Sequence, residues 1–273
     1  AALAGLTPAF AQQQARSEFR VDPGAGEGGP FEAFGKLPYE YYKNIGVTNK
    51  TTYEINADMT LKNVMGYRQL QRETLLDYDS TPVPTITAFQ YADIDTYSEE
   101  LQLQGVALDS KLDYVTGLYY FLEKGIDAAQ SSAFPMFRPT VPALLQVTQN
   151  GADGRSETYA AFLAGTYAFT DELSLSAGVR YNYDARRAIV GPRVPYAGTC
   201  RFDLNSATVA IETVPLAVSR VSASKSWNAI TWDTTLQWQP TAETMLYAAV
   251  RKGFRSGGYS TRAGNYDQLK PFD

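Results

Sequence analysis

The 273-residue chain has no histidine and a single cysteine, Cys200. An internal disulfide is therefore impossible, and the commonest metal ligand and catalytic base in proteins is missing. Only 19% of the residues are charged, and the net charge of −5 argues against a nucleic-acid partner, which would need a concentrated basic surface. No apolar run approaches the roughly 20 residues of a membrane-spanning helix. We therefore expect no catalytic residue, metal site, cofactor or enzymatic activity.

Long stretches of alternating apolar and polar residues are the main feature of the chain. In residues 173–184 one face would carry Leu, Leu, Ala, Val, Tyr and Tyr, and the other Ser, Ser, Gly, Arg, Asn and Asp. This period of two is typical of a β-strand with one apolar and one polar face. We predict about eight strands, near residues 50–57, 60–75, 94–104, 111–125, 156–169, 172–188, 226–239 and 243–256.

The predicted strands are long, and the connections between them alternate in length. A strand of about 14 residues, tilted by about 40°, would reach roughly 35 Å, which exceeds the apolar band of about 25 Å in outer-membrane barrels. Short turns near 58–59, 107–110, 170–171 and 240–242 alternate with long loops near 76–93, 126–155 and 189–225. Outer-membrane barrels have this asymmetry. We predict an all-β fold, an antiparallel transmembrane β-barrel segment of about eight strands.

Five segments resemble the TonB-dependent receptors of the bacterial outer membrane. They are, in chain order, residues 41–53, 97–103, 112–121, 169–181 and 246–259. No single segment is specific, but their ordered series is. The resemblance covers residues 41–273 and implies the β-barrel portion of a larger barrel of about 22 strands. It also implies energised uptake of a scarce large nutrient, most often an iron–siderophore complex.

The resemblance also sets the expected domain organisation. We assign residues 1–48 to an extracellular-type loop or N-terminal segment and residues 49–273 to a partial barrel. The first 11 residues fit either the tail of a signal peptide or a loop from a preceding strand, and we favour the loop. The family's plug domain and TonB-engaging box are not recognisable in this sequence. We therefore expect a fragment, with the TonB complex engaged through a plug outside these residues.

Ten residues are candidates for contact with a ligand. The charged side chains expected to face the barrel lumen are Glu100, Arg180, Asp233, Arg251 and Arg255. The aromatic side chains expected in ligand-contacting loops are Tyr41, Tyr42, Phe134, Phe137 and Tyr196. Arginine pairs bidentately with carboxylates, so such a lumen suits an anionic chelate. The alternatives are that the charges pair with each other or with a plug, and that the aromatics serve ordinary loop packing.

Two other functions fit the same pattern of strands. One is a passive porin or a structural outer-membrane barrel, and the other is a soluble all-β binding module. The membrane interpretation requires the apolar face to contact outer-membrane lipid, whereas a soluble module would bury that face in a protein core. The predicted location is accordingly the bacterial outer membrane, with lipid and a ferric siderophore or similar ligand as partners.

Overall fold

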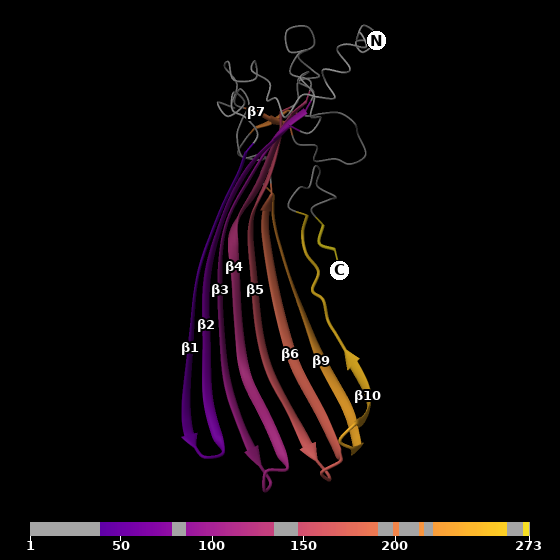
Figure 1. Cartoon of the computed structure of the whole chain (residues 1–273). Coiled ribbons are helices and arrows are strands. Elements are labelled where there is room, and N and C mark those ends of the chain that lie inside the picture. Colours follow the sequence, from indigo (N-terminus) through magenta and orange to yellow (C-terminus); the bar gives the residue numbers. More distant parts are fainter. Residues whose placement is uncertain are drawn as a thin grey trace, which may run out of the picture.

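The computed structural model describes residues 39–77, 86–133, 147–190, 199–201, 213–215, 221–260 and 270–272. These residues form strands, and none of them belongs to a helix that could cross a membrane (Figure 1). The strands are β1 (Tyr39–Asn56), β2 (Met59–Asp77), β3 (Ile86–Ala107), β4 (Leu112–Ala133), β5 (Val147–Ala168), β6 (Leu173–Val190), β7 (Thr199–Arg201), β8 (Thr213–Pro215), β9 (Val221–Thr241) and β10 (Thr244–Lys252).

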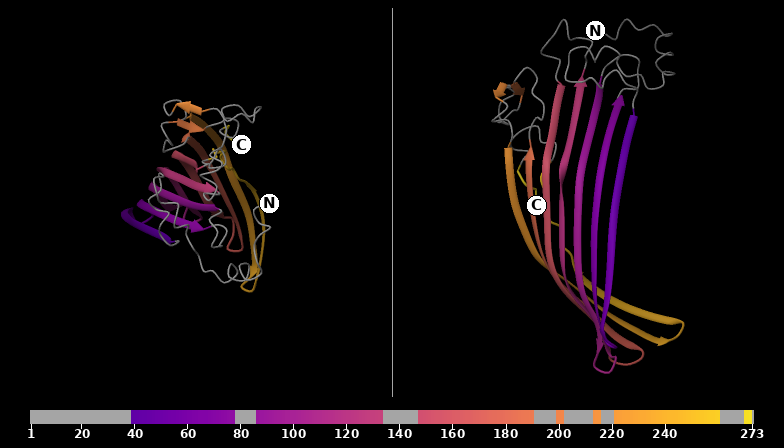
Figure 2. Two further views of the ribbon diagram at one scale, coloured as in Figure 1. Left: turned by 90° about the horizontal axis from the view of Figure 1, so that it is seen from above. Right: turned by 90° about the vertical axis from the view of Figure 1, so that its left-hand side faces the viewer.

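Eight of these strands form one antiparallel sheet in the order β1-β2-β3-β4-β5-β6-β9-β10, and β7 pairs with β8 in a separate two-stranded sheet. The large sheet is strongly curved, and it does not close, because β1 and β10 each have a neighbour on one side only (Figure 2). A curved, open antiparallel sheet is the geometry of a partial barrel. The predicted all-β fold is confirmed.

Short turns join the strands in pairs at one end of the sheet (Figure 1). In the β1–β2 turn the Asp58 amide donates to Asn56 Oδ1 at 2.9 Å, and in the β5–β6 turn the Leu173 amide donates to Thr170 Oγ1 at 3.0 Å. The β3–β4 turn places three consecutive residues at positive φ, with Asp109 at 56°. Asn, Asp and Thr favour such turns because their side chains bond nearby backbone groups. The short connections therefore lie where the sequence predicts them.

The strand register gives the sheet one strongly apolar face. On this face Val179 of β6 lies between Leu163 of β5 and Trp232 of β9, and these side chains are 46%, 52% and 41% exposed. Along β9 the side chains of this face are more exposed than their neighbours, as expected on the convex side of a curved sheet. On β6 the apolar side chains run from 173 to 183, which at about 3.3 Å per residue and a tilt of about 40° gives a band of roughly 25 Å.

Several strands extend further toward the long-loop end than the sequence suggests. β1 begins at residue 39, not near 50, so residues 39–48 belong to a strand and not to a loop. β3, β4 and β5 likewise include residues 86–93, 126–133 and 147–155, which the alternation pattern assigns to loops. Beyond the apolar band both faces of the sheet carry polar residues, so the period-two hydrophobic signal fades although the hydrogen-bonded ladder continues.

Candidate functional site

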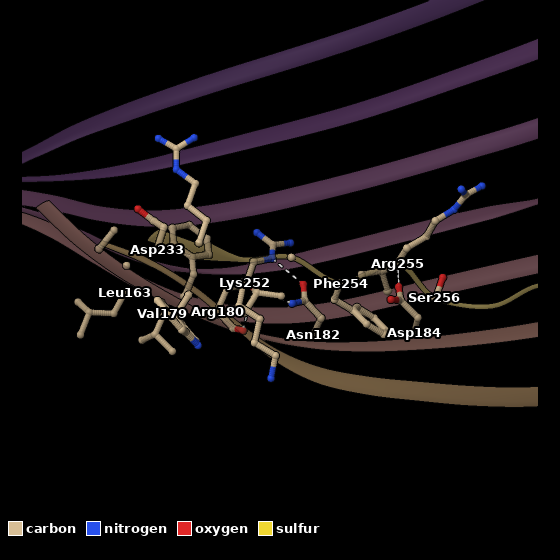
Figure 3. A pocket seen from close by; sticks show the side chains of 18 residues that line it. Leu163, Val179, Arg180, Asn182, Asp184, Asp233, Lys252, Phe254, Arg255 and Ser256 are labelled. Atoms are coloured by element: carbon tan, nitrogen blue, oxygen red, sulfur yellow. Dashed lines mark hydrogen bonds between the residues drawn. The ribbon is translucent and has the colours of Figure 1, made fainter. Parts of the chain in front are cut away.

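An open cavity of about 720 Å³ lies on the concave side of β5, β6 and β9, where the segment after β10 passes over the sheet. The residues that line it come from β5, β6, β9 and β10 and from residues 253–256 (Figure 3). Its polar and aromatic lining includes Arg180, Asn182, Asp184, Thr231, Asp233, Arg251, Phe254, Arg255 and Ser256.

Strand β6 positions the central group of this cavity. Alternate residues of a strand point to the same face, so Arg180, Asn182, Asp184 and Arg186 project together from the concave side. The Arg180 guanidinium lies 5.1 Å from the centre of the Tyr119 ring and 5.7 Å from that of Phe162. Its Nε donates to Asn182 Oδ1 at 2.8 Å. Cation–π contact and this hydrogen bond hold the guanidinium in place before any ligand arrives.

Hydrogen bonds between neighbouring strands fix the orientation of Asn182 and Asp184. Asn182 Nδ2 donates to Thr231 Oγ1 at 3.3 Å, and that hydroxyl is 3.3 Å from the Arg180 carbonyl oxygen, to which it donates. Thr158 Oγ1 donates to the carboxylate of Asp184. Because β5, β6 and β9 each contribute a partner, the orientation of these side chains depends on the sheet register.

Arg186 connects the sheet to the segment that follows β10. Its terminal guanidinium nitrogen donates to Ser256 Oγ at 2.9 Å, while its buried Nε has no hydrogen-bond partner among the described residues. Gly257 is buried beside the Trp227 ring, so that a Cβ there would lie 2.7 Å from a ring carbon. A buried guanidinium N–H without an acceptor costs free energy. A ligand oxygen that accepted a hydrogen bond from Arg186 Nε would remove this cost.

The remaining charges of the cavity come from β9, β10 and the segment beyond. Asp233 lies over Gly178, where a Cβ would be 2.8 Å from its Oδ1, and it is the cross-strand neighbour of Arg251. Within the described part of the chain neither Arg251 nor Arg255 forms an ion pair. Both guanidinium groups are therefore open to an external anion.

The concave side is divided by charge. The part formed by β6, β9, β10 and the following segment carries Arg180, Arg186, Lys225, Arg251 and Arg255 against Asp184 and Asp233. The part formed by β3 and β4 carries Glu100, Asp113, Glu123 and Asp127. Lumen surfaces of one sign raise the local concentration of ligands of the opposite sign. The cavity therefore lies in a part of the concave side where cationic side chains outnumber acidic ones, next to the acidic part on β3 and β4.

The structure brings most of the predicted charged residues together. Arg180, Asp233, Arg251 and Arg255 line the cavity. Glu100 lies on the same face of β3 but outside the cavity, where its carboxylate accepts from Gln102 Nε2 and its cross-strand neighbour is Tyr119.

The structure does not place the aromatic candidates in the cavity. The prediction that Tyr41 and Tyr42 lie in a loop is wrong, because both belong to β1 and point to opposite faces of the sheet. The ladder with β2 extends as far as Tyr39 and therefore includes them. Phe134, Phe137 and Tyr196 lie outside the described residues.

The cavity also includes polar residues that were not among the candidates, such as Asn182, Asp184, Thr231 and Ser256. The period-two pattern could have added Asn182 and Asp184, because they follow Arg180 on the same face of one strand. The contribution of Ser256 depends on the path of the chain after β10, for which the sequence contains no signal.

Replacing Gly117 with Val is expected to destabilise the sheet under Arg180. A Cβ at this position would lie 2.6 Å from the Phe162 ring and also meet the Leu101 carbonyl, so the ring that supports the guanidinium must move. Overpacking of this kind costs about 1–3 kcal/mol. Gly154→Val is the matched control, since the nearest atom to its Cβ would be 4.0 Å away. Equal unfolding midpoints of the two variants in denaturant would contradict the packing described here.

Among the described residues no group of three His, Cys, Asp or Glu side chains could hold a metal ion. The chemistry available in the cavity is therefore charge pairing and hydrogen bonding from arginine, amide and hydroxyl groups, together with stacking on Phe254.

Comparisons with known proteins agree with this geometry. The family model "TonB dependent receptor-like, beta-barrel" matches residues 4–272. The structure is similar to the ferric yersiniabactin uptake receptor FyuA from Yersinia pestis, with a TM-score of 0.66, 15% identity and coverage of 87% of this chain and 32% of that chain. It is also similar to the siderophore receptor PiuA from Acinetobacter baumannii, with a TM-score of 0.58, 12% identity and coverage of 85% and 35%.

A third similar structure is the ferric-catecholate import receptor Fiu from E. coli K12 in its open form, with a TM-score of 0.56, 14% identity and coverage of 78% of this chain and 36% of that chain. A comparison with curated proteins gives no match. The chain spans about a third of the length of the receptors whose structures it resembles. The match over residues 4–272 shows that the chain belongs to the TonB-dependent receptor-like β-barrel family.

Proposed function

We propose that this chain forms part of the barrel of an outer-membrane TonB-dependent receptor that takes up an anionic ferric siderophore. The observation that carries the proposal is the cationic cavity on the concave side of the sheet, opposite a convex apolar band. In a membrane-embedded barrel the convex face contacts lipid and the concave face contacts water and ligand. The solved receptors with similar folds are named for ferric yersiniabactin, ferric catecholate and siderophores.

The arginines of the cavity supply the binding chemistry in this proposal. Arg180 is already oriented by two aromatic rings and Asn182, so it loses little freedom on binding a carboxylate or catecholate oxygen. Arg251 and Arg255 add charge without a competing ion pair in the described part of the chain. In this proposal the energy for release into the periplasm comes from the TonB complex, acting through the plug domain of the full-length receptor.

A ligand panel tests the proposal on the full-length receptor that contains this chain. We expect anionic ferric catecholate or ferric hydroxycarboxylate chelates to bind at least tenfold more tightly than a neutral oligosaccharide or cobalamin, because three arginines line the cavity and Arg186 lies next to it. Binding is measured by quenching of intrinsic fluorescence, and uptake by cell-associated radioactive iron.

The control for energised transport is the same uptake assay in cells that lack TonB. If uptake persisted in these cells at a rate that depended only on solute size, the chain would belong to a passive porin and the proposal would be wrong. Tighter binding of the neutral ligands would keep the receptor but overturn its assignment to ferric chelates.

A further inference from the structure

A group of polar side chains interrupts the apolar convex face on β1, β2 and β3, which lie side by side (Figure 1). The register places Asn49 of β1 opposite Met65 of β2, and Met65 opposite Glu99 of β3. Thr51 lies opposite Asn63, two residues closer to the short turn. Pairing through β4 and β5 puts all of them on the same face as the apolar side chains of β6. We refer to Asn49, Thr51, Asn63 and Glu99 as the polar cluster.

The polar cluster lies inside the apolar band and not at its edge. On β3 the next side chain of this face toward the long loops is Tyr97, whose ring centroid is 4.9 Å from that of Tyr67 on β2. On β1 the next side chain toward the short turn is Tyr53, which is 65% exposed. Tyrosines of membrane proteins gather at the two levels where hydrocarbon meets the headgroups. The polar cluster lies between these levels and therefore faces hydrocarbon.

Hydrogen bonds within the polar cluster satisfy only part of its polar groups. Asn63 Nδ2 donates to Glu99 Oε1 at 3.0 Å, and Thr51 Oγ1 donates to Asn49 Oδ1 at 2.9 Å. Among the described residues the Glu99 carboxylate has no cationic partner, and the Asn49 amide nitrogen has no acceptor. Both side chains are exposed. Ionisable groups at membrane depth are unfavourable unless they pair with another polar group, so the cluster requires a polar partner from outside the sheet.

We propose that the polar cluster is the centre of a twofold contact between two copies of the receptor in the membrane. Asn49 of each copy donates to Glu99 of the other, and Met65 lies on the axis between them. A rotation about the membrane normal leaves heights unchanged, so the two partners must be equally high in the sheet. β1 ends at Asn56 and β3 ends at Ala107, which places Asn49 and Glu99 seven and eight residues from their short turns.

A second copy satisfies the cluster, whereas lipid does not. Acyl chains have no hydrogen-bond donor for a carboxylate. A twofold contact requires one patch that contains both a donor and its acceptor, and Asn49 and Glu99 meet this requirement on opposite sides of Met65. Met65 is 50% exposed, and its flexible side chain can pack against its counterpart on the axis. The inference rests on the membrane location in the proposed function, and not on the transported ligand, because the cavity is on the opposite face.

Disulfide cross-linking in isolated outer membranes tests the contact. Met65→Cys is introduced into the full-length receptor, with Cys200 and any other native cysteine replaced by serine. Oxidation is expected to link two copies of the receptor, because residue 65 meets its own counterpart on the twofold axis. Val179→Cys is the matched control, since Val179 is 46% exposed on the same face but belongs to β6, four strands away. We expect it to give at least tenfold less cross-linked dimer.

An exchange of the two polar residues tests their reciprocal pairing. In the Met65→Cys background, Glu99→Leu is expected to reduce the cross-linked dimer on the order of tenfold, because both hydrogen bonds between the copies are lost in hydrocarbon. Asn49→Glu is expected to do the same, because it places carboxylates opposite each other. The double variant N49E/E99N exchanges donor and acceptor and is expected to restore the dimer.

Equal cross-linking of Met65→Cys and Val179→Cys would overturn the inference, as would a dimer yield that Glu99→Leu leaves unchanged or that N49E/E99N does not restore. A cross-link from Met65→Cys to a different protein would also overturn it. Heat-modifiable receptor in the outer membrane and ferric chelate binding are measured on the same samples. Absence of the parent receptor from the outer membrane, or loss of its chelate binding, contradicts the proposed function. A receptor that assembles and binds the chelate without dimer formation contradicts this inference alone.

Discussion

A full-length receptor in which Val179 is replaced by Arg is expected to fail to assemble in the outer membrane. Val179 is 46% exposed and lies in the middle of the apolar band, between Leu163 and Trp232. Arginine at the midplane of a lipid-facing strand costs about 2–4 kcal/mol, which is a large part of the stability of most domains. The measurement is the amount of heat-modifiable receptor in isolated outer membranes, and we expect at least a tenfold decrease.

The control places the same charge on the other face. Thr235 of β9 pairs with Ser176 and lies on the concave side, where an arginine remains in water. Thr235→Arg is therefore expected to assemble at nearly the parental level. If both variants assembled equally well, the convex face would not be in contact with lipid, and a soluble all-β module would explain the sheet better than a membrane barrel.

The faces of the sheet could be predicted from the sequence because strand geometry allows only two. Once residues 173–184 alternate, the position of Val179 on one face and of Arg180 on the other follows from the period of two. The short turns could be located as well, since Asn56 and Thr170 cap them through their own side chains.

The ends of the strands could not be predicted in this way. β3 begins at Ile86, yet its first residues lie beyond the apolar band, where no lipid selects for apolar side chains on alternate positions. Backbone hydrogen bonding continues there and leaves no trace in hydrophobicity. Residues 39–48 of β1 were missed for a related reason, because Tyr42 and Lys43 reverse the alternation that continues on either side of them.

The composition of the cavity was predicted only in part. Alternation places Arg180 on the concave face, but its aromatic partners Tyr119 and Phe162 come from β4 and β5. Their contact with Arg180 depends on the register of three strands, which the sequence alone does not specify. The contact of Arg186 with Ser256 joins residues 70 apart in the chain and follows from the path of the segment after β10.

Replacement of Arg180 by Gln is expected to weaken ferric chelate binding by the full-length receptor on the order of 100-fold, because removing one partner of a hydrogen-bonded charge pair costs about 2–5 kcal/mol. Arg180 is the cation that Tyr119, Phe162 and Asn182 hold in a fixed orientation, so neighbouring arginines cannot take its place without reorganisation. The dissociation constant is measured by fluorescence quenching, and the iron uptake rate is measured in parallel.

Arg68→Gln is a closely matched control. Arg68 is also on the concave side, on β2, and its Nε donates to Asn44 Oδ1 at 2.8 Å, the same donor and distance as in the Arg180–Asn182 pair. It lies away from the cavity, so its loss is expected to leave chelate affinity unchanged. The two readouts separate ligand contact from pairing with a plug domain. If Arg180→Gln slowed uptake while the chelate still bound with parental affinity, the arginine would serve the plug, and the cationic cavity would have to be reassigned from ligand capture to the coupling of the barrel with its plug.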